Sequence, residues 1–564
     1  MSDSSSSSSR LPARPSLEQL QKQAKELLKQ HRAGEKAALD RFLVVNMRTA
    51  DSQPTLADAQ FVLARECGFE SWARLRGQVS MMRSTRPLFL SSTVPFYTIN
   101  WVNNEVSVQG PQSEKSWDAV LGVMTERRIS KLRASSMSDS VLERLADLNH
   151  VIHLRIAGSS GVTDQGVKHL VRMPQLQDLE LGGQNSTISD QGLDSLRQLT
   201  NLRRFQACWT PAIPDAGLAG LSHCDQLEDV NVLGTQTGDG TIRALMGKSH
   251  LRYFRSGQRV TDAGLALFQH FPIFRTWHGG DIGYGLMSAD TKPNHLLIDG
   301  PFTDAGLASL RGLEGLFALS FFWHCPAFTS EGLLPLQQLL NLGFLGCQSS
   351  HCDDEAMRYI ADFPRLRILM GQSAVASDAG FEALSRSQTI EYIWGRECPN
   401  LTGRGFSALA SMPALRGVAV SCKNVGDASL ARLVEFPALR EFMPMDVPDA
   451  GFRHIGRCPN LEAVWCMYCR DTGDVATEHL AGLSQLKTYY AGKTDITDRS
   501  LETLGRMVSL EHIELWQCAG LTDTGLAYLA GLPKLREISL HGLSNVTRKA
   551  TAMFPLQVQI KYSE

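Results

Sequence analysis

The sequence lacks several features that would place it in a functional class at once. No run of about 18 apolar residues occurs, which is the length that a membrane-spanning helix needs, and a serine run from Ser4 to Ser9 stands where a secretory signal would need a hydrophobic segment. Neither sign of charge is in excess, since 56 lysines and arginines stand against 58 aspartates and glutamates. Because there is no net charge to attract a polyanion, we expect no nucleic-acid partner. Because there is no apolar run and no hydrophobic signal segment, we expect a cytoplasmic protein with no membrane partner.

Signatures of catalysis and of cofactor binding are also scarce. The 15 histidines share no common position, and no Ser-His-Asp, paired-carboxylate or nucleophilic-cysteine arrangement can be assembled from the sequence. Neither a P-loop nor a dinucleotide fingerprint is present. The 12 cysteines, in a chain without an export signal, are expected to be reduced thiols used as small hydrophobic residues. The sequence therefore predicts a protein that is not an enzyme and uses no cofactor.

The N-terminal part of the chain has helical periodicity. Residues 1–14 have the composition of a flexible tail, and residues 15–80 contain three amphipathic stretches that start near Ser16, Ala37 and Thr55. The simplest product is a three-helix bundle. The string from Thr55 to Trp72 resembles a segment that precedes ankyrin-repeat arrays in bacterial proteins. That resemblance implies a bacterial origin and a downstream repeat array but no activity, and the ankyrin signature Thr-Pro-Leu-His is absent.

Most of the remaining chain repeats two short motifs. The pattern L-x-x-L-x-L recurs every 21 to 26 residues from Val151 to Leu535, with Phe274 and His295 as two of its starting positions. Between these predicted strands, the pattern Thr-Asp-x-Gly-Leu, clearest after Thr163 and Thr522, introduces a short amphipathic helix. One strand and one helix per unit is the leucine-rich repeat. We therefore expect an α/β fold, a solenoid of about 18 units over residues 129–564, with parallel strands on the concave face and helices outside.

The segment between the helical module and the repeats, residues 81–128, is expected to hold a linker, a hairpin and an N-terminal cap. The hairpin is predicted around Asn103 and Asn104, and the cap helix begins near Trp117. Such a cap would protect the first repeat, whose core and strand edge are otherwise exposed.

The repeat around Cys518 resembles a particular leucine-rich subtype. Residues 510–526 carry L-x-x-L-x-L-x-x-C followed by L-T-D-x-G-L, as in the cysteine-containing repeats of ubiquitin-ligase substrate receptors. Cys208, Cys325 and Cys422 lie near the same repeat position. The resemblance implies an adaptor that delivers substrates to a ubiquitin-ligase-like machine. The F-box that such receptors carry is poorly matched, because Leu11-Pro12 and Trp72 lie too far apart.

Large aromatic side chains fall on predicted solvent-facing strand positions. Because side chains alternate along a strand, the motif leucines should point into the solenoid and the intervening residues to the concave face. Exposed rings on such a surface are typical of an interaction hot spot, although they could also stack on each other and stiffen the sheet, and a register error of one residue would turn them inward. The predicted partner-binding residues are Trp209, Tyr253, Phe344, Tyr392, Trp394, Trp465, Tyr468, Tyr490 and Trp516.

For the other residues that could catalyse a reaction or bind a metal, we favour a structural role. Aspartates such as Asp164 and Asp523 recur at the start of every helix, as caps do, whereas a catalytic carboxylate is needed once. Cys466 and Cys469 have the spacing of half a metal site, but no second pair follows. The run from His351 to Asp354 places possible ligands side by side in a turn, where neighbours rarely converge on one metal. We predict no metal site.

One loop interrupts the repeat. The stretch from Trp277 to Gly285 is rich in glycine and lacks the helix motif, so we interpret it as an irregular loop that replaces a helix and could enlarge the binding surface. The leading hypothesis is a non-catalytic scaffold that binds a protein or peptide on its concave face. The adaptor is the alternative, and a hydrolase or metal enzyme seated at this loop is a third hypothesis.

Overall fold

The computed structural model describes residues 17–44, 54–66, 72, 75, 96–110, 112–183, 187–277, 279, 282–286, 293–467, 469 and 471–563. The chain divides into two compact units, Met1–Gln112 with Asp118–Arg133, and Ser113–Trp117 with Ala134–Glu564. No helix among the described residues is long and apolar enough to cross a bilayer.

The first unit contains the helical module and a hairpin. Helices α1 (Leu17–Arg32), α2 (Lys36–Val44) and α3 (Leu56–Glu66) pack around a core that includes Leu27 and Phe42. Arg41 on α2 donates two hydrogen bonds, of 2.8 and 2.7 Å, to the carboxylate of Glu66 on α3. Strands β1 (Tyr97–Asn100) and β2 (Glu105–Val108) form the expected antiparallel hairpin. Helix α5 (Glu114–Arg127) and strand β3 (Lys131–Ala134) follow.

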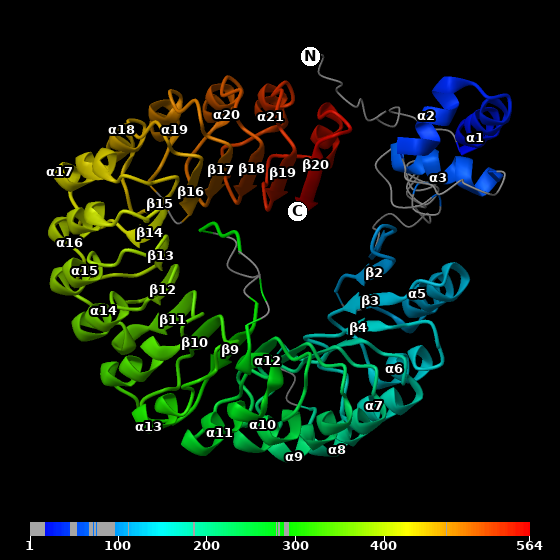
Figure 1. Cartoon of the computed structure of the whole chain (residues 1–564), viewed down its shortest axis with the longest axis horizontal. Helices are drawn as coiled ribbons and strands as arrows, with labels where there is room; N and C mark the ends of the chain where they lie inside the picture. Colours follow the sequence, from blue (N-terminus) through cyan, green and yellow to red (C-terminus); the bar gives the residue numbers. More distant parts are fainter. Residues whose placement is uncertain are drawn as a thin grey trace. The chain divides into compact units, whose positions relative to one another are not determined.

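The second unit is the repeat array, in which each strand pairs in parallel with the strand of the next repeat. Its strands lie on the inner side of the curve and its helices on the outer side (Figure 1). The strands are β4 (His153–Arg155), β5 (Asp178–Glu180), β6 (Arg204–Gln206), β7 (Asp229–Asn231), β8 (Tyr253–Arg255), β9 (His295–Ile298), β10 (Ala318–Phe321), β11 (Phe344–Gln348), β12 (Ile368–Gln372), β13 (Tyr392–Gly395), β14 (Gly417–Ser421), β15 (Glu441–Met445), β16 (Ala463–Met467), β17 (Thr488–Gly492), β18 (His512–Trp516), β19 (Glu537–His541) and β20 (Gln559–Ser563).

Short helices, several of them continued by a 3-10 turn, connect these strands. They are α6 (Asp139–Leu145), α7 (Asp164–Lys168), α8 (Asp190–Leu193), α9 (Asp215–Leu218), α10 (Asp239–Leu245), α11 (Asp262–Ala266), α12 (Pro272–Arg275), α13 (Asp304–Ala308), η6 (Ser330–Gln338), α14 (Asp354–Ile360), α15 (Asp378–Leu384), α16 (Gly403–Ala408), α17 (Asp427–Leu430), α18 (Phe452–Ile455), α19 (Asp474–Leu480), α20 (Asp498–Leu504) and α21 (Asp523–Leu529).

One continuous row of inward residues runs through the sheet and forms the centre of the core. The inward second residue of one strand pairs with its equivalent in the next one, for example Leu345 with Leu369 and Leu369 with Ile393. These three side chains are at most 2% exposed. Since each strand covers only its neighbour, the apolar residues of one repeat are buried only when the next repeat is present.

The repeat motif was assigned wrongly at two positions. Phe274 is not followed by a strand of the array: it lies in α12 and packs with Phe268 and Phe271. Strand β8 instead pairs directly with β9, with Phe254 opposite Leu296. The inward residue of β9 is therefore Leu296, so the repeat starts two residues before His295. The residues between α12 and β9 form an insertion in the array.

Candidate functional site

The concave face is formed by the strand residues on either side of the inward row. In β13, Ile393 belongs to the core, so its neighbours Tyr392 and Trp394 lie on the opposite face of the sheet. Trp465 on β16 and Tyr490 on β17 are paired on that same face, with ring centroids 6.2 Å apart. The predicted alternation thus places the rings on the concave side.

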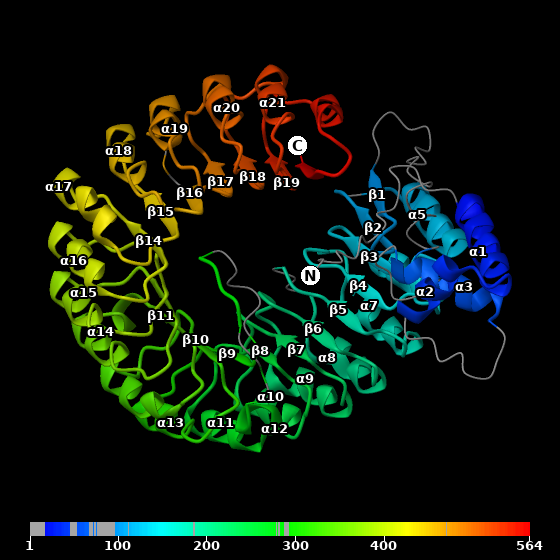
Figure 2. The same cartoon turned by 45° about the horizontal axis from the view of Figure 1, so that its top comes forward.

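The insertion lies across this face and covers part of it. In Figure 1 and Figure 2 the green segment that follows α12 leaves the array and extends along the inner side of the strands. Trp277 packs on Phe317 with ring centroids 5.4 Å apart, and Tyr284 stacks on the same ring at 5.7 Å with an interplanar angle of 13°. Leu286 is 5% exposed and belongs to a hydrophobic cluster with Phe344 and Tyr392.

Hydrogen bonds to Arg367, Tyr392 and Glu441 hold residues 282–286, which we call the crossing segment. Arg367 donates from Nη1 to the carbonyl oxygen of Ile282 at 2.8 Å. The hydroxyl of Tyr392 donates to the carbonyl oxygen of Tyr284 at 2.9 Å, and the amide of Leu286 donates to Oε2 of Glu441 at 2.9 Å. Tyr392 and Glu441 begin β13 and β15, and Arg367 directly precedes β12, so the segment is fixed through its main chain to repeats far along the sequence.

Arg367 is positioned for two contacts with this segment. Its guanidinium forms a bidentate pair with Glu391, with distances of 2.7 and 3.1 Å. Its Cζ also lies 4.9 Å from the ring centroid of Tyr284, close enough for a cation–π contact. The Glu391 pair leaves the guanidinium little freedom, which favours both contacts with the crossing segment.

The insertion changes the exposure of several predicted partner-binding residues. Phe344 and Tyr392 are 0% and 4% exposed, because the crossing segment and neighbouring strands cover them, and Tyr490 is 6% exposed beside Trp465. The prediction that these three rings are open to a partner was wrong for this conformation. Tyr253, Trp394, Trp465 and Trp516 are half-buried, and Trp209 is 40% exposed. Tyr468 lies outside the described residues.

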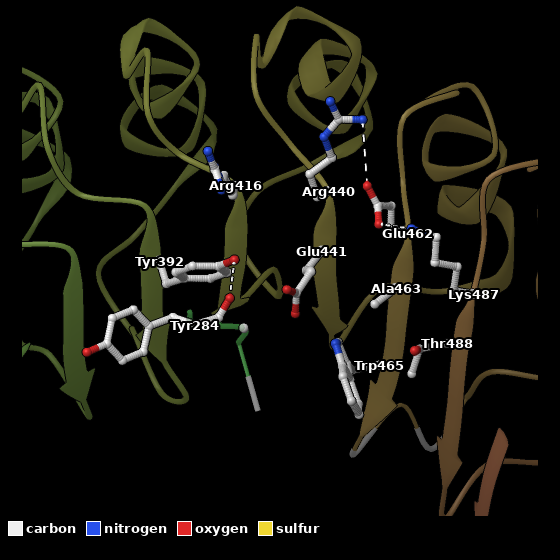
Figure 3. A pocket seen from close by; sticks show the side chains of 11 residues that line it. Tyr284, Tyr392, Arg416, Arg440, Glu441, Glu462, Ala463, Trp465, Lys487 and Thr488 are labelled. Atoms are coloured by element: carbon white, nitrogen blue, oxygen red, sulfur yellow. Dashed lines mark hydrogen bonds and ion pairs between the residues drawn. The ribbon is translucent and has the colours of Figure 1, made fainter. Parts of the chain in front are cut away.

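A recess of about 560 Å³ opens where the crossing segment ends (Figure 3). Its walls combine rings with charges of both signs, and Arg440 and Lys487 both approach Glu462, at 3.9 and 2.6 Å. Burial raises the pKa of Glu441, and the amide of Leu286 opposes that shift. The lining residues are Tyr284, Gly285, Tyr392, Arg416, Arg440, Glu441, Glu462, Ala463, Trp465, Lys487 and Thr488.

The concave face of β4 to β8 has a different chemistry, which the sequence reasoning missed. Asp178 contacts Arg155 at 2.6 Å and Arg204 at 3.4 Å, while Asp229 contacts Arg204 at 3.5 Å and Arg255 at 3.2 Å. Asp178, Arg204 and Asp229 occupy equivalent positions in successive strands, and Arg155 and Arg255 lie two residues further along β4 and β8. A search for alternating charge at one fixed repeat position would have found the three central residues of this ladder.

The other candidate groups take structural positions. Cys466 is fully buried in β16, and Cys469 donates from Sγ to the carbonyl oxygen of Pro444 at 2.8 Å. Asp353 caps α14 by accepting a hydrogen bond from the amide of Ala356 at 2.7 Å. Among the described residues, no group of three or more His, Cys, Asp or Glu side chains is arranged to hold a metal ion. The eleven cysteines that the structure describes are free thiols, and all but Cys208 are buried.

The repeating strand, turn and helix, the continuous inward row and the Thr-Asp-x-Gly-Leu caps together identify the architecture. The fold is a leucine-rich repeat solenoid. No family model matches the chain. Among solved structures, the chain is similar to an internalin from Listeria monocytogenes, with 16% identity over 61% of this chain and 82% of that one, at a TM-score of 0.29. It is also similar to the complex of Rad7 and Elc1 in yeast, with 13% identity over 80% of this chain and 88% of that one, at a TM-score of 0.33.

Proposed function

We propose that the chain is a cytoplasmic, non-catalytic scaffold that binds a protein or peptide partner on the concave face of its leucine-rich repeats. The observation that carries this proposal is the crossing segment, an irregular stretch of polypeptide that already lies on this face. It is held by ring contacts and by main-chain hydrogen bonds at Arg367, Tyr392 and Glu441. A surface that accepts one such segment has the chemistry to accept another.

The open part of the face supports the same proposal. Trp465 and Trp516 remain half-buried, so each ring still has surface to lose on docking. Arg416 and Lys487, at the rim of the recess, are exposed and carry charge that could select among partners. Rings flanked by charges are the usual arrangement of a protein-binding hot spot.

The proposal is tested by affinity purification from the source organism with three single variants. We expect Trp465→Ala and Trp516→Ala each to reduce the recovery of specific partners by about tenfold or more, because hot-spot truncations cost about 2 kcal/mol or more. Tyr528→Ala is the matched control, since it removes a ring that is 46% exposed on the outer helix α21. Recovery that is the same for all three variants, with unchanged melting temperatures, would contradict the proposal.

A second candidate is an adaptor that links a bound partner to a ubiquitin-ligase-like machine. The observation that favours it is the bundle of α1 to α3, which has its own apolar core in the unit separate from the repeats. An adaptor needs such a second part to bind the machine. Purification of the full chain and of a chain without residues 1–80 tests this idea, because only the full chain should recover a ligase component. An absence of any ligase component with the full chain would exclude it.

A further inference from the structure

The crossing segment has a regular sequence and a regular path. Its residues are Ile282, Gly283, Tyr284, Gly285 and Leu286, so large apolar side chains alternate with glycine. The segment reaches from Arg367, next to β12, past Tyr392 on β13 to Glu441 on β15. Three strand spacings amount to about 14 Å, and four residues of extended chain span about 13 Å. The segment therefore crosses the strands in a nearly extended form.

The concave face is shaped to receive this segment. A Cβ atom added to Gly417 would lie 2.4 Å from the ring of Tyr392 and 3.4 Å from Cδ1 of Leu286. One added to Gly343 would lie 2.1 Å from the ring of Phe317, on which Tyr284 stacks. Glycine at these two positions, one in β14 and one directly before β11, leaves room for the rings and so for a trough across β11 to β15.

The contacts show at which positions of the segment the trough restricts the side chain and at which positions it does not. A Cβ atom at Gly285 would meet Oε1 of Glu441 at 3.0 Å, whereas one at Gly283 would have nothing within 4 Å. The hydroxyl oxygen of Tyr284 is buried and, among the described residues, has no hydrogen-bond partner. The trough therefore recognises the phenyl ring and not the phenol oxygen, and it excludes a large residue directly after the ring.

We propose that the crossing segment occupies the binding site of a partner, and that the partner presents an extended segment of the form aliphatic, any residue, aromatic, small residue, aliphatic. The partner's segment displaces residues 282–286 from the trough. This inference rests on the proposed function, and it names both the part of the concave face and the chemistry that it recognises. Phenylalanine is the preferred aromatic residue, because it leaves no buried hydroxyl without a partner.

Displacement is a competition between a tethered and a free ligand. The tether gives the crossing segment an effective concentration in the millimolar range, so a free segment with the same contacts binds the intact protein weakly. A variant whose own segment cannot dock removes that competition. A peptide with the sequence of the crossing segment can therefore serve as the probe, and the wild-type protein is the control for a variant whose segment cannot dock.

The test uses the full chain and a fluorescein-labelled peptide with the sequence of residues 280–288, measured by fluorescence anisotropy. The protein variant Tyr284→Ala, Leu286→Ala vacates the trough. We expect it to bind the peptide at least about tenfold more tightly than the wild-type protein does, because the competing segment is lost. Thermal melts of both proteins establish that the variant is folded, and Gly417→Leu in the variant background should abolish binding by filling the trough.

Peptide variants test the proposed specificity. Tyr284→Phe in the peptide should bind at least as tightly as the parent peptide, and Tyr284→Ala should lose binding by about tenfold or more. Gly285→Val should weaken binding more than the matched change Gly283→Val. Equal binding of the parent peptide to wild-type protein and to the folded variant, or no binding to the variant, would overturn the inference. The proposed function would still stand in that case if the Trp465 and Trp516 substitutions reduced partner recovery.

Discussion

At the scale of single residues, the aspartate that begins most of the outer helices acts between repeats. The threonine or serine before it caps the helix, as Thr522 does by accepting a hydrogen bond from the amide of Thr524 at 3.2 Å. The carboxylate of Asp498, in the preceding repeat, accepts from the amide of Thr522 at 2.9 Å and from its hydroxyl at 2.6 Å. The same pair recurs at Asp139 and Thr163. The predicted cap thus belongs to the threonine, and the aspartate ties its repeat to the next one.

Loss of this tie is expected to destabilise the repeat array. Asp498→Ala removes two hydrogen bonds to a charged acceptor and leaves the cap residue of the next helix without its partner, so we expect the free energy of unfolding to fall by about 2 kcal/mol. Asp147→Ala is the control, because its pair with Arg172 is a surface contact with the aspartate side chain 69% exposed, and such pairs contribute about 0.5 kcal/mol or less. Urea denaturation followed by circular dichroism measures both, and equal losses would refute the tie.

Glu441 makes the stability of the folded protein sensitive to pH. Burial raises the pKa of this carboxyl above its ordinary value of 4.5, so the folded protein binds a proton more tightly there than the unfolded chain does. Stability from this group is therefore present at low pH and is lost as the pH rises from about 4.5 through the raised pKa.

Glu441→Gln should remove this pH dependence while keeping an oxygen to accept the Leu286 amide. We expect the stability of the variant relative to wild type to increase as the pH rises from about 4 to about 8, because only the wild-type protein then carries a buried charge. The difference in unfolding free energy, measured at several pH values, gives the result. A difference that does not change with pH would show that Glu441 titrates as it does in the unfolded chain.

At the scale of elements, the strands of the concave face differ in what they present. Strands β4 to β8 carry the charge ladder of Asp178 and Asp229, whereas β11 to β15 carry rings and glycine and are covered by the crossing segment. The change occurs near the insertion between α12 and β9. One repeat geometry thus supports a polar and an apolar stretch of the same face, because the concave residues are not constrained by the core.

A substitution of Gly417 on β14 tests whether the strands maintain the trough. Gly417→Ala places a Cβ atom 2.4 Å from the ring of Tyr392, and such overpacking costs about 1–3 kcal/mol. Gly482→Ala is the control, because a Cβ atom there meets nothing within 4 Å, and we expect a change of at most about 1 kcal/mol. Urea denaturation of the two variants distinguishes them. Equal stabilities would mean that the Tyr392 ring can move freely and that no trough is maintained.

At the scale of the whole repeat array, the insertion adds contacts between distant repeats, whereas the strand pairs described above join only neighbouring repeats. The hydrogen bonds between the crossing segment and Arg367, Tyr392 and Glu441 join positions 85, 108 and 155 residues apart. A repeat array unfolds cooperatively only as far as its interfaces between neighbours allow. The crossing segment connects several repeats at once and should extend that cooperativity.

Removal of this connection is expected to broaden unfolding. Tyr284→Ala combined with Leu286→Ala should reduce the denaturant m value or separate the transition into two, since the repeats around β12 to β15 would no longer be joined to the insertion. Tyr528→Ala again serves as the control on the outer surface. An m value equal to that of the wild-type protein, despite lower overall stability, would show that the segment packs on the array without coupling its repeats.

The sequence by itself determined the repeat period, the inward row and the helix caps. Each of these features depends on local chemistry that recurs at a constant spacing, such as Leu369 in its strand and Thr522 before its helix. The motif failed at Phe274 because α12 is followed by the insertion, so that the next strand to pair with β8 is β9. The sequence also determined that the predicted partner-binding rings lie on the concave face of the sheet and not in the core, because side chains alternate along any strand.

Only the tertiary structure decided which of those rings are accessible. The crossing segment covers Phe344 and Tyr392 through contacts with strands many repeats later, and no spacing in the sequence encodes where an irregular segment will dock. Its position depends on the shape of the whole concave face, including the space that Gly417 leaves open. Local patterns specify each repeat, whereas contacts between distant residues form only after the repeats have stacked into one surface.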